Sequence, residues 1–398
     1  MSSGDAPVTD DTRPVHDRPT LMSYASMSTW SWFVYAFGAS LALLRDDEGT
    51  STTIGGLHGT ALAIGGVIGA AIAPTFSNRI GRGNLMRVAS LGAAVSILIY
   101  ILPGQKVGGT LLLAFAACFF GNLLVVGVNS FIGVHQGKAT PAALTESTAI
   151  AALMGLLAPL AVGFATTTIF GWRGGVAVAV IAFFVIEIVR GRRTSEYGVA
   201  GGAATRKTHG KLPGLTYWAI MAGTCYMGTE FCMSLWGVDL LRAQAGMSPG
   251  AAAAGLASLT GGIFVGRAFG SKLAQKVHAE ALLRFSLIAS IVAFLFTWLT
   301  SAPAVVLTFM FLTGVSFSLI WPLSMARILR TAPGLTDRAA GTTLAFATGA
   351  IAVAPFVLGA LASSVSIHTA FIVVPILLVT QTILVFAKPV TTEILTHS

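Results

Sequence analysis

Long apolar stretches recur along almost the whole chain and are separated by short loops rich in glycine, proline or charge. A helix needs roughly 20 mostly apolar residues to cross the hydrocarbon core of a bilayer. Only 10% of the residues are charged and the mean hydropathy is +0.81, which excludes a soluble domain of 398 residues. The alternating segments of an outer-membrane barrel are absent. We therefore predict an all-α membrane protein with twelve transmembrane helices, at 23–44, 53–77, 84–102, 110–133, 142–166, 172–189, 215–239, 250–274, 282–300, 304–326, 340–363 and 368–387.

The basic residues indicate how these helices are oriented. If the N-terminus is cytosolic, all but five of the 24 Lys and Arg face the cytosol; the exceptions are Arg45, Lys106, Arg173, Arg242 and Arg267. This is the bias that positively charged loops impose on topology. The net charge of +9 is thus a topology signal, and no nucleic-acid partner is expected. We predict a multi-pass protein of the inner (cytoplasmic) membrane with both termini in the cytosol.

The two halves of the sequence repeat each other. Leu43-Leu44-Arg45-x3-Gly49-x-Ser51 reappears 197 residues later as Leu240-Leu241-Arg242-x3-Gly246-x-Ser248. At the same offset Gly65 and Gly69 correspond to Gly262 and Gly266. Six helices followed by six in the same sense form a parallel repeat about an axis normal to the membrane. The predicted units are a disordered tail at 1–20, a six-helix bundle at 21–189, a basic cytosolic linker at 190–214, a second bundle at 215–390 and a tail at 391–398.

At this point the chain resembles the major facilitator superfamily, over residues 21–390. The loop Ser77-Asn78-Arg79-Ile80-Gly81-Arg82-Gly83 is similar to the Asp-Arg-x-Gly-Arg-Arg/Lys signature of that family. In the family this loop gates the cytosolic side through contacts to the opposite half, so the resemblance implies gating roles for Asn78, Arg79 and Arg82. Asn78 replaces the usual aspartate and Gly83 a basic residue, which removes charge from the gate.

A proline-glycine element recurs in both halves. Gly155-x3-Pro159-x3-Gly163 resembles the Gly-Pro-x-x-Gly-Gly element of proton-coupled exporters, and Pro355-x3-Gly359 repeats its second part. A proline inside a membrane helix frees a backbone carbonyl and permits a bend. Pro159, Gly163, Pro355 and Gly359 are therefore hinge candidates. Their recurrence also fits simple helix packing, and both interpretations stay open.

Two ionisable residues fall inside predicted spans and are functional candidates, because burying a charge at mid-membrane costs about 3 kcal/mol or more. Glu230 lies near the middle of its span, one turn from Tyr226, and could exchange protons. Arg267 could pair with Glu230, hold an anionic substrate or extend to the cytosol. Neither has a charged counterpart in the first half, since the 197-residue offset matches them with Phe33 and Ala70.

The resemblance also implies which residues face the substrate, because spans one, four, seven and ten line the cavity in this family. The cavity candidates are Trp30, Phe33, Phe37, Asn122, Asn129, Tyr226, Phe317 and Trp321, together with Arg267. Aromatic surface mixed with amides and one acid suits an amphipathic or weakly basic organic molecule better than a sugar. The alternative is that these aromatic residues simply pack the helices or anchor them at the interface.

Other polar residues have local interpretations. Asp239 is placed to pair with Arg242 three residues later. Asp46, Asp47 and Glu48 are expected in a solvated external loop, and His58 in a hydrogen-bonded packing role. No phosphate-binding loop, metal-ligand spacing or catalytic triad is present, so we expect no enzyme activity, no cofactor and no metal.

These observations predict a monomeric secondary active transporter that moves a small organic molecule across the inner membrane by alternating access. The partners are the substrate, protons and the lipid bilayer, and the preferred mode is proton-coupled export by antiport, with Glu230 as the coupling residue. One alternative is gradient-driven uptake of an organic acid or nutrient, in which Arg267 dominates substrate affinity. An alternative of another class is a membrane receptor or scaffold that does not transport.

Overall fold

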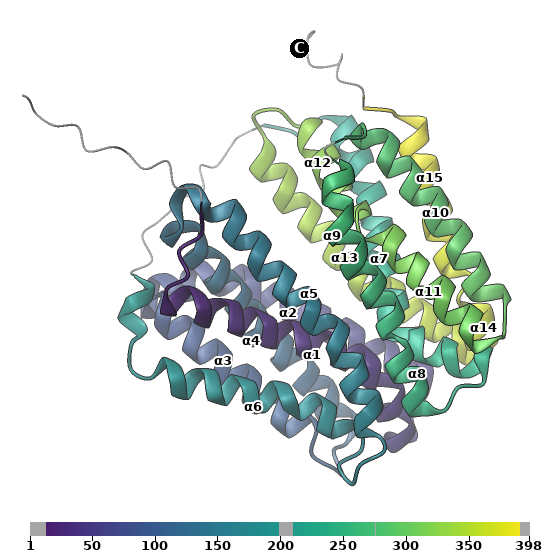
Figure 1. Cartoon of the computed structure of the whole chain (residues 1–398), viewed down its shortest axis with the longest axis horizontal. Coiled ribbons are helices and arrows are strands. Elements are labelled where there is room, and N and C mark those ends of the chain that lie inside the picture. Colours follow the sequence, from purple (N-terminus) through teal and green to yellow (C-terminus); the bar gives the residue numbers. More distant parts are fainter. Residues whose placement is uncertain (1–12, 199–209, 275, 391–398) are drawn as a thin grey trace, which may run out of the picture.

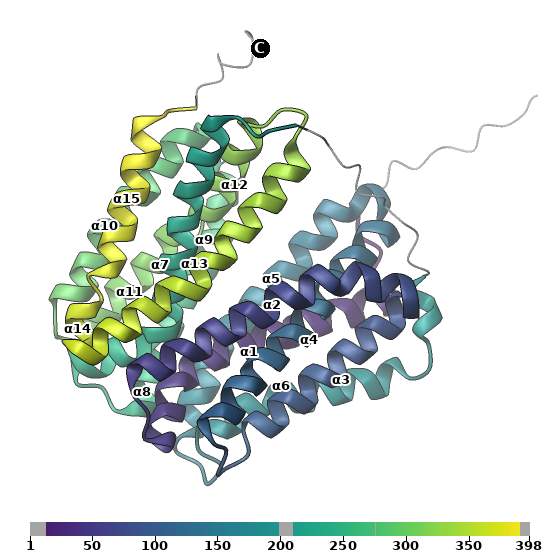
Figure 2. The same ribbon diagram turned by 180° about the vertical axis from the view of Figure 1, so that it is seen from behind.

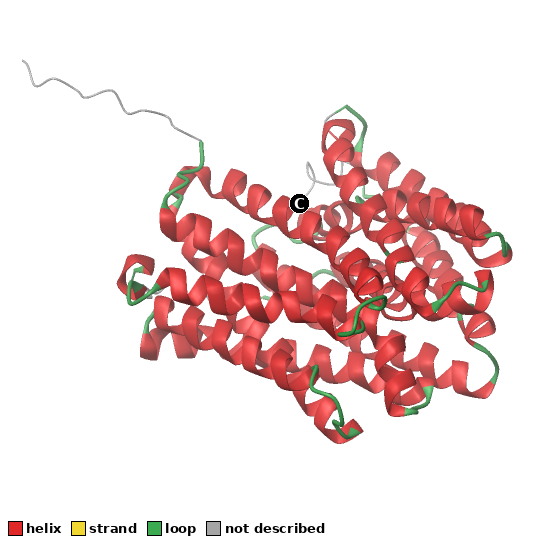
Figure 3. Ribbon diagram, turned by 60° about the horizontal axis from the view of Figure 1, so that its bottom comes forward, coloured by secondary structure: helices red, strands yellow, loops and turns green. Residues whose placement is uncertain are grey.

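The computed structural model describes residues 13–198, 210–274 and 276–390. Within these ranges the regular structure is helical and contains no strand (Figure 3). Nine spans are single helices: α1 Arg18–Glu48, α2 Thr52–Ile80, α3 Arg82–Tyr100, α4 Val107–His135, α5 Thr140–Ala165, α6 Trp172–Arg190, α7 Gly214–Ala245, α10 Ala279–Leu299 and α13 Thr336–Ser364. Three spans are made of two pieces each: α8 Pro249–Gly255 with α9 Ala257–Ala274, α11 Pro303–Phe317 with α12 Ile320–Arg330, and α14 Ile367–Ala370 with α15 Val373–Ala387.

The twelve spans form two six-helix bundles, which confirms the predicted fold class (Figures 1 and 2). Eleven of the spans are long and apolar enough to cross a membrane within the described residues. Span α7 is not among these eleven, since threonines, glycines and Glu230 lower its hydropathy. The predicted tails fall mostly, and the predicted linker partly, outside the described residues, at 1–12, 199–209 and 391–398.

Helix ends follow from capping chemistry. Helix α1 begins at Arg18, inside the predicted tail, because the Asp17 side chain accepts a hydrogen bond from the Thr20 amide (3.1 Å) and Pro19 occupies the first turn. Span ten breaks at 318–319, just before Pro322, whose missing N–H removes a helical hydrogen bond. These effects account for the early start of α1 and for the break in span ten.

The repeat seen in the sequence is also a structural repeat. Gly49 and Gly246 both end a helix in the left-handed conformation, with φ of 62° and 61°. Two residues later the hydroxyls of Ser51 and Ser248 cap the next helix, accepting from the amides of Ile54 (3.4 Å) and Ala251 (3.3 Å). The repeated Gly-x-Ser is thus a helix stop followed by a helix start.

We call the end of the molecule that holds Gly49 and Gly246 the outer end, following the predicted orientation, and the opposite end the inner end. The bundles touch toward the outer end, where α5 meets α8 and α2 meets α13, and their helices diverge toward the inner end (Figures 1 and 2). The two bundles therefore form a wedge that is closed at the outer end.

Candidate functional site

A polar cluster lies where the two halves meet, near the middle of the helices. It comprises Glu230 and Tyr226 from α7, Arg267 from α9 and Tyr35 from α1, and these four side chains interact electrostatically with one another. Glu230 is 9% exposed, whereas Arg267 is exposed. Glu230 and Arg267 are not within ion-pair distance in this conformation. The cluster therefore holds a carboxylate and a guanidinium that are close enough to interact but do not bind each other directly.

A cavity of about 140 Å³ adjoins Glu230. Tyr35 and Gly38 line it from the first half, and Glu230 and Ser234 from the second. The backbones approach closely here: a Cβ on Gly38 would lie 2.5 Å from the Ser234 carbonyl oxygen. The carboxyl group of Glu230 is thus placed at the boundary between the halves.

A second cavity, of about 520 Å³, lies beside the first. Its volume is in the range of pockets that hold small organic ligands. Trp30 and Asn122 supply its aromatic and amide surface, and Phe231 is shared with the smaller cavity. The rest of its wall consists mainly of small and aliphatic residues from α2 and α13, which are Leu62, Ala63, Gly66, Val67, Ala70, Ala71, Gly341, Leu344, Ala345, Thr348 and Ile351.

The predicted cavity residues differ in whether they line the described cavities. Trp30, Phe37 and Asn122 line the described cavities. Phe33, Tyr226 and Phe317 are fully buried and line neither of them. The Tyr226 hydroxyl donates to the Phe317 carbonyl oxygen (3.0 Å), and the two rings meet edge to face with centroids 5.6 Å apart. In this conformation these aromatic residues are packed between helices.

Two further cavity candidates lie toward the inner end. Asn129 is exposed on α4, and Trp321 is half-buried at the start of α12, near Gly223. Neither lines the two cavities described above.

The outer end is held by two ion pairs between the halves. Arg45 donates to Asp239 (2.8 Å) and Arg242 donates to Asp46 (2.7 Å). The predicted pairing of Asp239 with Arg242 is therefore wrong, because each of these residues pairs with a residue of the first half instead. Asp46, Asp47 and Glu48 belong to the last turn of α1 rather than to a loop, and Asp47 pairs with Arg173 (2.7 Å).

The hinge candidates lie in continuous helices, and their glycines permit close contacts between the halves. A Cβ on Gly163 would lie 2.6 Å from the Gly250 carbonyl oxygen on α8. One on Gly359 would lie 2.6 Å from the Thr52 carbonyl oxygen on α2 and 2.5 Å from the Trp236 ring. Pro159 and Pro355 each lie four residues earlier, and the Pro355 carbonyl accepts the Trp236 indole N–H (2.8 Å).

The gating-loop candidates differ in their surroundings. Asn78 and Arg79 are exposed at the inner end of α2. Arg82 is 3% exposed, and its guanidinium donates to the carbonyl oxygen of Tyr197 (3.2 Å) in the short helix η2, Thr194–Tyr197. In this conformation Arg82 thus contacts the end of its own half rather than the opposite half.

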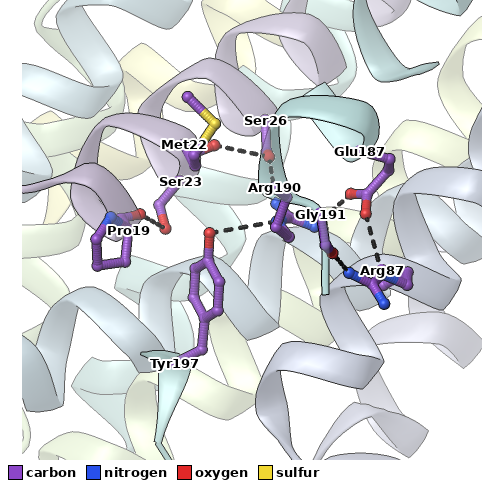
Figure 4. Close-up of polar contacts among 9 residues, drawn as sticks. All are labelled: Pro19, Met22, Ser23, Ser26, Arg87, Glu187, Arg190, Gly191 and Tyr197. Atoms are coloured by element: carbon purple, nitrogen blue, oxygen red, sulfur yellow. Dashed lines mark hydrogen bonds and ion pairs between the residues drawn. The ribbon is translucent and has the colours of Figure 1, made fainter. Parts of the chain in front are cut away.

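A buried charge cluster stands beside this contact (Figure 4). Arg190, 1% exposed, pairs with Glu187 and donates to the hydroxyls of Ser26 (2.9 Å) and Tyr197 (3.2 Å). Arg87 approaches the other Glu187 oxygen at 3.5 Å. Burial raises the pKa of the Tyr197 phenol, although the nearby Arg190 charge lowers it. The cluster ties α1, α3, α6 and η2 together at the inner end.

Sequence reasoning did not identify Tyr35 as part of the site. Its ring packs against Gly155 of α5, where an added Cβ would lie 2.6 Å from it, and its hydroxyl interacts with Glu230 and Arg267. Gly155 was visible in the sequence only as the start of the proline-glycine element. The pairing of a tyrosine with a glycine on another helix leaves no signal in a single sequence.

Comparisons with known proteins agree with this architecture. Residues 21–347 match the Major Facilitator Superfamily. A search of curated proteins found no match. Similar solved structures include the E. coli xylose transporter XylE in an inward-open conformation, with TM-score 0.75, 11% identity, and 94% of this chain and 96% of that chain covered.

Two further similar structures were solved in an inward-facing and in an outward conformation. A bacterial homologue of the human lysosomal transporter Spinster, inward-facing and occupied, has TM-score 0.74 and 12% identity over 93% of this chain and 97% of that one. The transporter FucP in an outward conformation has TM-score 0.61 and 14% identity over 94% and 99%. At these identities the likeness concerns the fold.

Proposed function

Because this chain belongs to the Major Facilitator Superfamily, we propose that it exports a small organic molecule across the cytoplasmic membrane in exchange for protons. The observation that carries this proposal is the position of Glu230. Its carboxyl group lies between the halves, beside a cavity, among Tyr35, Tyr226 and Arg267. A carboxylate in such a place can gain or lose a proton as access to the two sides alternates.

The cavities favour an amphipathic or weakly basic substrate. The larger cavity offers apolar wall with the Trp30 ring and the Asn122 amide, and Phe231 connects it to the smaller cavity at Glu230. A molecule with an apolar body could occupy the first while a basic group approaches the carboxylate in the second. A proton and the cationic group of a substrate would compete for the same carboxylate. Because only one of them binds at a time, they would cross the membrane in opposite directions.

The wedge shape supports a transport cycle by alternating access. With both termini in the cytosol, the present conformation is open to the cytosol and closed by the outer ion pairs. Rocking of the two bundles would separate Arg45 from Asp239 and close the inner end, moving the site from one side to the other. The protein acts as a monomer in this scheme, since each chain contains both bundles.

The test is the variant Glu230→Gln in proteoliposomes, after a thermal-shift screen of organic cations and anions has supplied a substrate. Loss of transport driven by a pH gradient, with downhill exchange retained, supports coupling through Glu230. The matched control is Glu196→Gln in η2, which replaces an acid far from the cavities. If Glu230→Gln transports against a gradient as the unaltered protein does, the coupling proposal is wrong.

The position of Arg267 beside the central site favours a second candidate, uptake of an organic acid. Since Arg267 is not ion-paired with Glu230 here, its charge remains open to a substrate carboxylate. In that case Arg267→Ala abolishes binding of the organic acid, and Arg267→Lys restores part of it. Retention of affinity in Arg267→Ala would eliminate uptake of organic acids and leave export.

A further inference from the structure

A hydrogen-bonded chain of three side chains lies at the outer end of the first half, apart from the central cluster. His58 of α2 is fully buried, and its Nε2 lies 2.9 Å from the Thr110 hydroxyl oxygen of α4. That hydroxyl oxygen also lies 2.7 Å from Oε1 of Glu48, the last residue of α1. On the other side of the ring, His58 Nδ1 lies 3.0 Å from the Ile54 carbonyl oxygen. Figure 1 shows where α1, α2 and α4 lie in the first bundle.

Counting hydrogens shows that a neutral histidine and an ionised glutamate do not fit this arrangement. The Ile54 carbonyl only accepts, so Nδ1 must carry a hydrogen and a neutral ring then leaves Nε2 as an acceptor. Nε2 and the Glu48 carboxylate would both need the single Thr110 hydroxyl hydrogen. In the other tautomer Nε2 donates, but the lone pair of Nδ1 faces the lone pairs of the carbonyl. Either way a buried polar contact fails, which costs about 1–3 kcal/mol.

One additional proton satisfies the contacts that join His58, Thr110 and Glu48. The Val107 carbonyl oxygen, on the same helix as Thr110, is the more distant acceptor for the Thr110 hydroxyl, at 3.0 Å. With an imidazolium, Nδ1 donates to Ile54, Nε2 donates to Thr110 and Thr110 donates to Glu48. With a protonated Glu48, Nδ1 still donates to Ile54, Thr110 donates to Nε2 and the carboxyl O–H donates to Thr110. We propose that the chain His58–Thr110–Glu48 is a proton-binding site that holds one proton when the outer end is closed. The second oxygen of Glu48, buried and without a hydrogen-bond partner among the described residues, is consistent with a neutral acid.

The neighbouring charges connect this site to the outer closure. Arg45 of α1 acts electrostatically on His58, Glu48 acts on Tyr100 of α3, and Arg173 of α6 also acts on Tyr100. In the closed conformation Arg45 is held by Asp239 of the other half, with its guanidinium 5.2 Å from the centre of the Trp236 ring. When the halves separate outside, Arg45 loses that carboxylate. Glu48, three residues further along α1, is then the acid on the same face of the helix as Arg45.

Opening should therefore release the proton. Pairing with Arg45 favours the ionised form of Glu48, and the carboxylate then no longer needs the proton that it shared with His58. Closing returns Arg45 to Asp239 and takes a proton up from the outside. This inference concerns the outer end and stands whether or not Glu230 couples transport to protons.

The direct test is nuclear magnetic resonance of the full-length protein with ¹⁵N-labelled histidine and ¹³C-carboxyl-labelled glutamate at pH 7.5. His58→Gln and Glu48→Gln identify the two signals. An ordinary histidine, with a pKa of about 6.5, is mostly neutral there, and an ordinary glutamate is ionised. Either an imidazolium His58 or a protonated Glu48 supports the proposal. A neutral His58 together with an ionised Glu48 in the closed conformation overturns it.

The second test measures the number of protons linked to closure. Distances between labels at Ile169→Cys and Ser301→Cys, both exposed at the outer end, report the ratio of closed to open molecules. Each proton bound on closing lowers this ratio about tenfold for every unit rise in pH. In Thr110→Val the number of protons bound on closing, given by this slope, should fall by one. In Thr110→Ser it should stay the same.

Thr313→Val is the matched control, since Thr313 is equally buried and its hydroxyl bonds only within α11, to Phe309 (2.8 Å). The same slope in Thr110→Val as in the unaltered protein overturns the proposal. Glu230→Gln distinguishes this proton site from proton coupling at Glu230. Any change that it causes in the slope is due to the central site.

Discussion

Arg45 and Asp239, 194 residues apart in sequence, form an ion pair of 2.8 Å across the boundary between the two halves. Their side chains are only 11% and 10% exposed. Arg242, which corresponds to Arg45 in the second half, pairs with Asp46 of the first half. The duplication thus preserved the arginines, whereas the sequence positions that correspond to the two acids hold Ala42 and Ala243. The outer closure has similar geometry on both sides but uses unrelated acids.

Arg45→Ala should shift the protein toward the outward-open conformation. Removing one partner of a largely buried ion pair leaves the other charge without compensation, which costs about 2 kcal/mol or more. This corresponds to a loss of roughly thirtyfold in the ratio of closed to open molecules. Label distances at the outer end measure the ratio.

Arg242→Ala provides the comparison, because its pair with Asp46 is 30% and 45% exposed. Exposed ion pairs contribute about 0–1 kcal/mol, so we expect a change of less than about fivefold. The exchange of charges in Arg45→Asp with Asp239→Arg should recover much of the closed population. Equal effects of Arg45→Ala and Arg242→Ala would contradict the assignment of the main closure to the buried pair.

Gly163→Ala and Gly359→Ala should each prevent full closure of the outer end. The added Cβ would lie 2.6 Å from a backbone oxygen of the opposite half in both cases, and backbone cannot move aside as a side chain can. We expect at least a tenfold loss of the closed population, measured by the same label distances. Gly349→Ala on α13 is the control, since nothing lies within 4 Å of its added Cβ. A closed population unchanged in both variants would show that the helices separate there without cost.

The fold could be predicted from the sequence because hydropathy and the repeat both act over long stretches. The site was predicted less completely. Glu230 could be named as a candidate because a charge inside an apolar span is conspicuous, but Tyr35 could not, since a tyrosine in a membrane helix is unremarkable. The pairing of Asp239 was predicted wrongly because the rule for neighbours on one helix does not include a partner from another bundle. Contacts between bundles depend on how the bundles are rotated, which no local pattern encodes.

Ala70→Phe should narrow the larger cavity and discriminate between substrates by size. Ala70 lines this cavity of about 520 Å³ from α2, and a phenyl ring there occupies space that an apolar ligand would need. We expect affinity for the larger substrates of the screen to fall about tenfold or more, while the smallest substrates bind nearly as before. Binding titrations in detergent measure this directly.

Val178→Phe, on the exposed side of α6, controls for the added ring itself. If Ala70→Phe binds every substrate with unchanged affinity, this cavity is not where the substrate lies.

Arg190→Ala should destabilise the first bundle without affecting the outer closure. Arg190 is the centre of the buried cluster in Figure 4, and Glu187 beside it is 7% exposed at its side chain. Without Arg190, Glu187 loses its closer ion pair and keeps the longer one to Arg87, 3.5 Å away, so we expect a loss of about 3 kcal/mol in stability. Thermal unfolding in detergent, followed at fixed heating rate, reports this as a lower apparent Tm.

Tyr197→Phe removes one hydrogen bond from Arg190 and should cost about half as much. Because the cost of Arg190→Ala comes from the carboxylate left behind, adding Glu187→Gln should restore part of the stability. A double variant that is less stable than Arg190→Ala alone would show that Glu187 stabilises the bundle through other contacts.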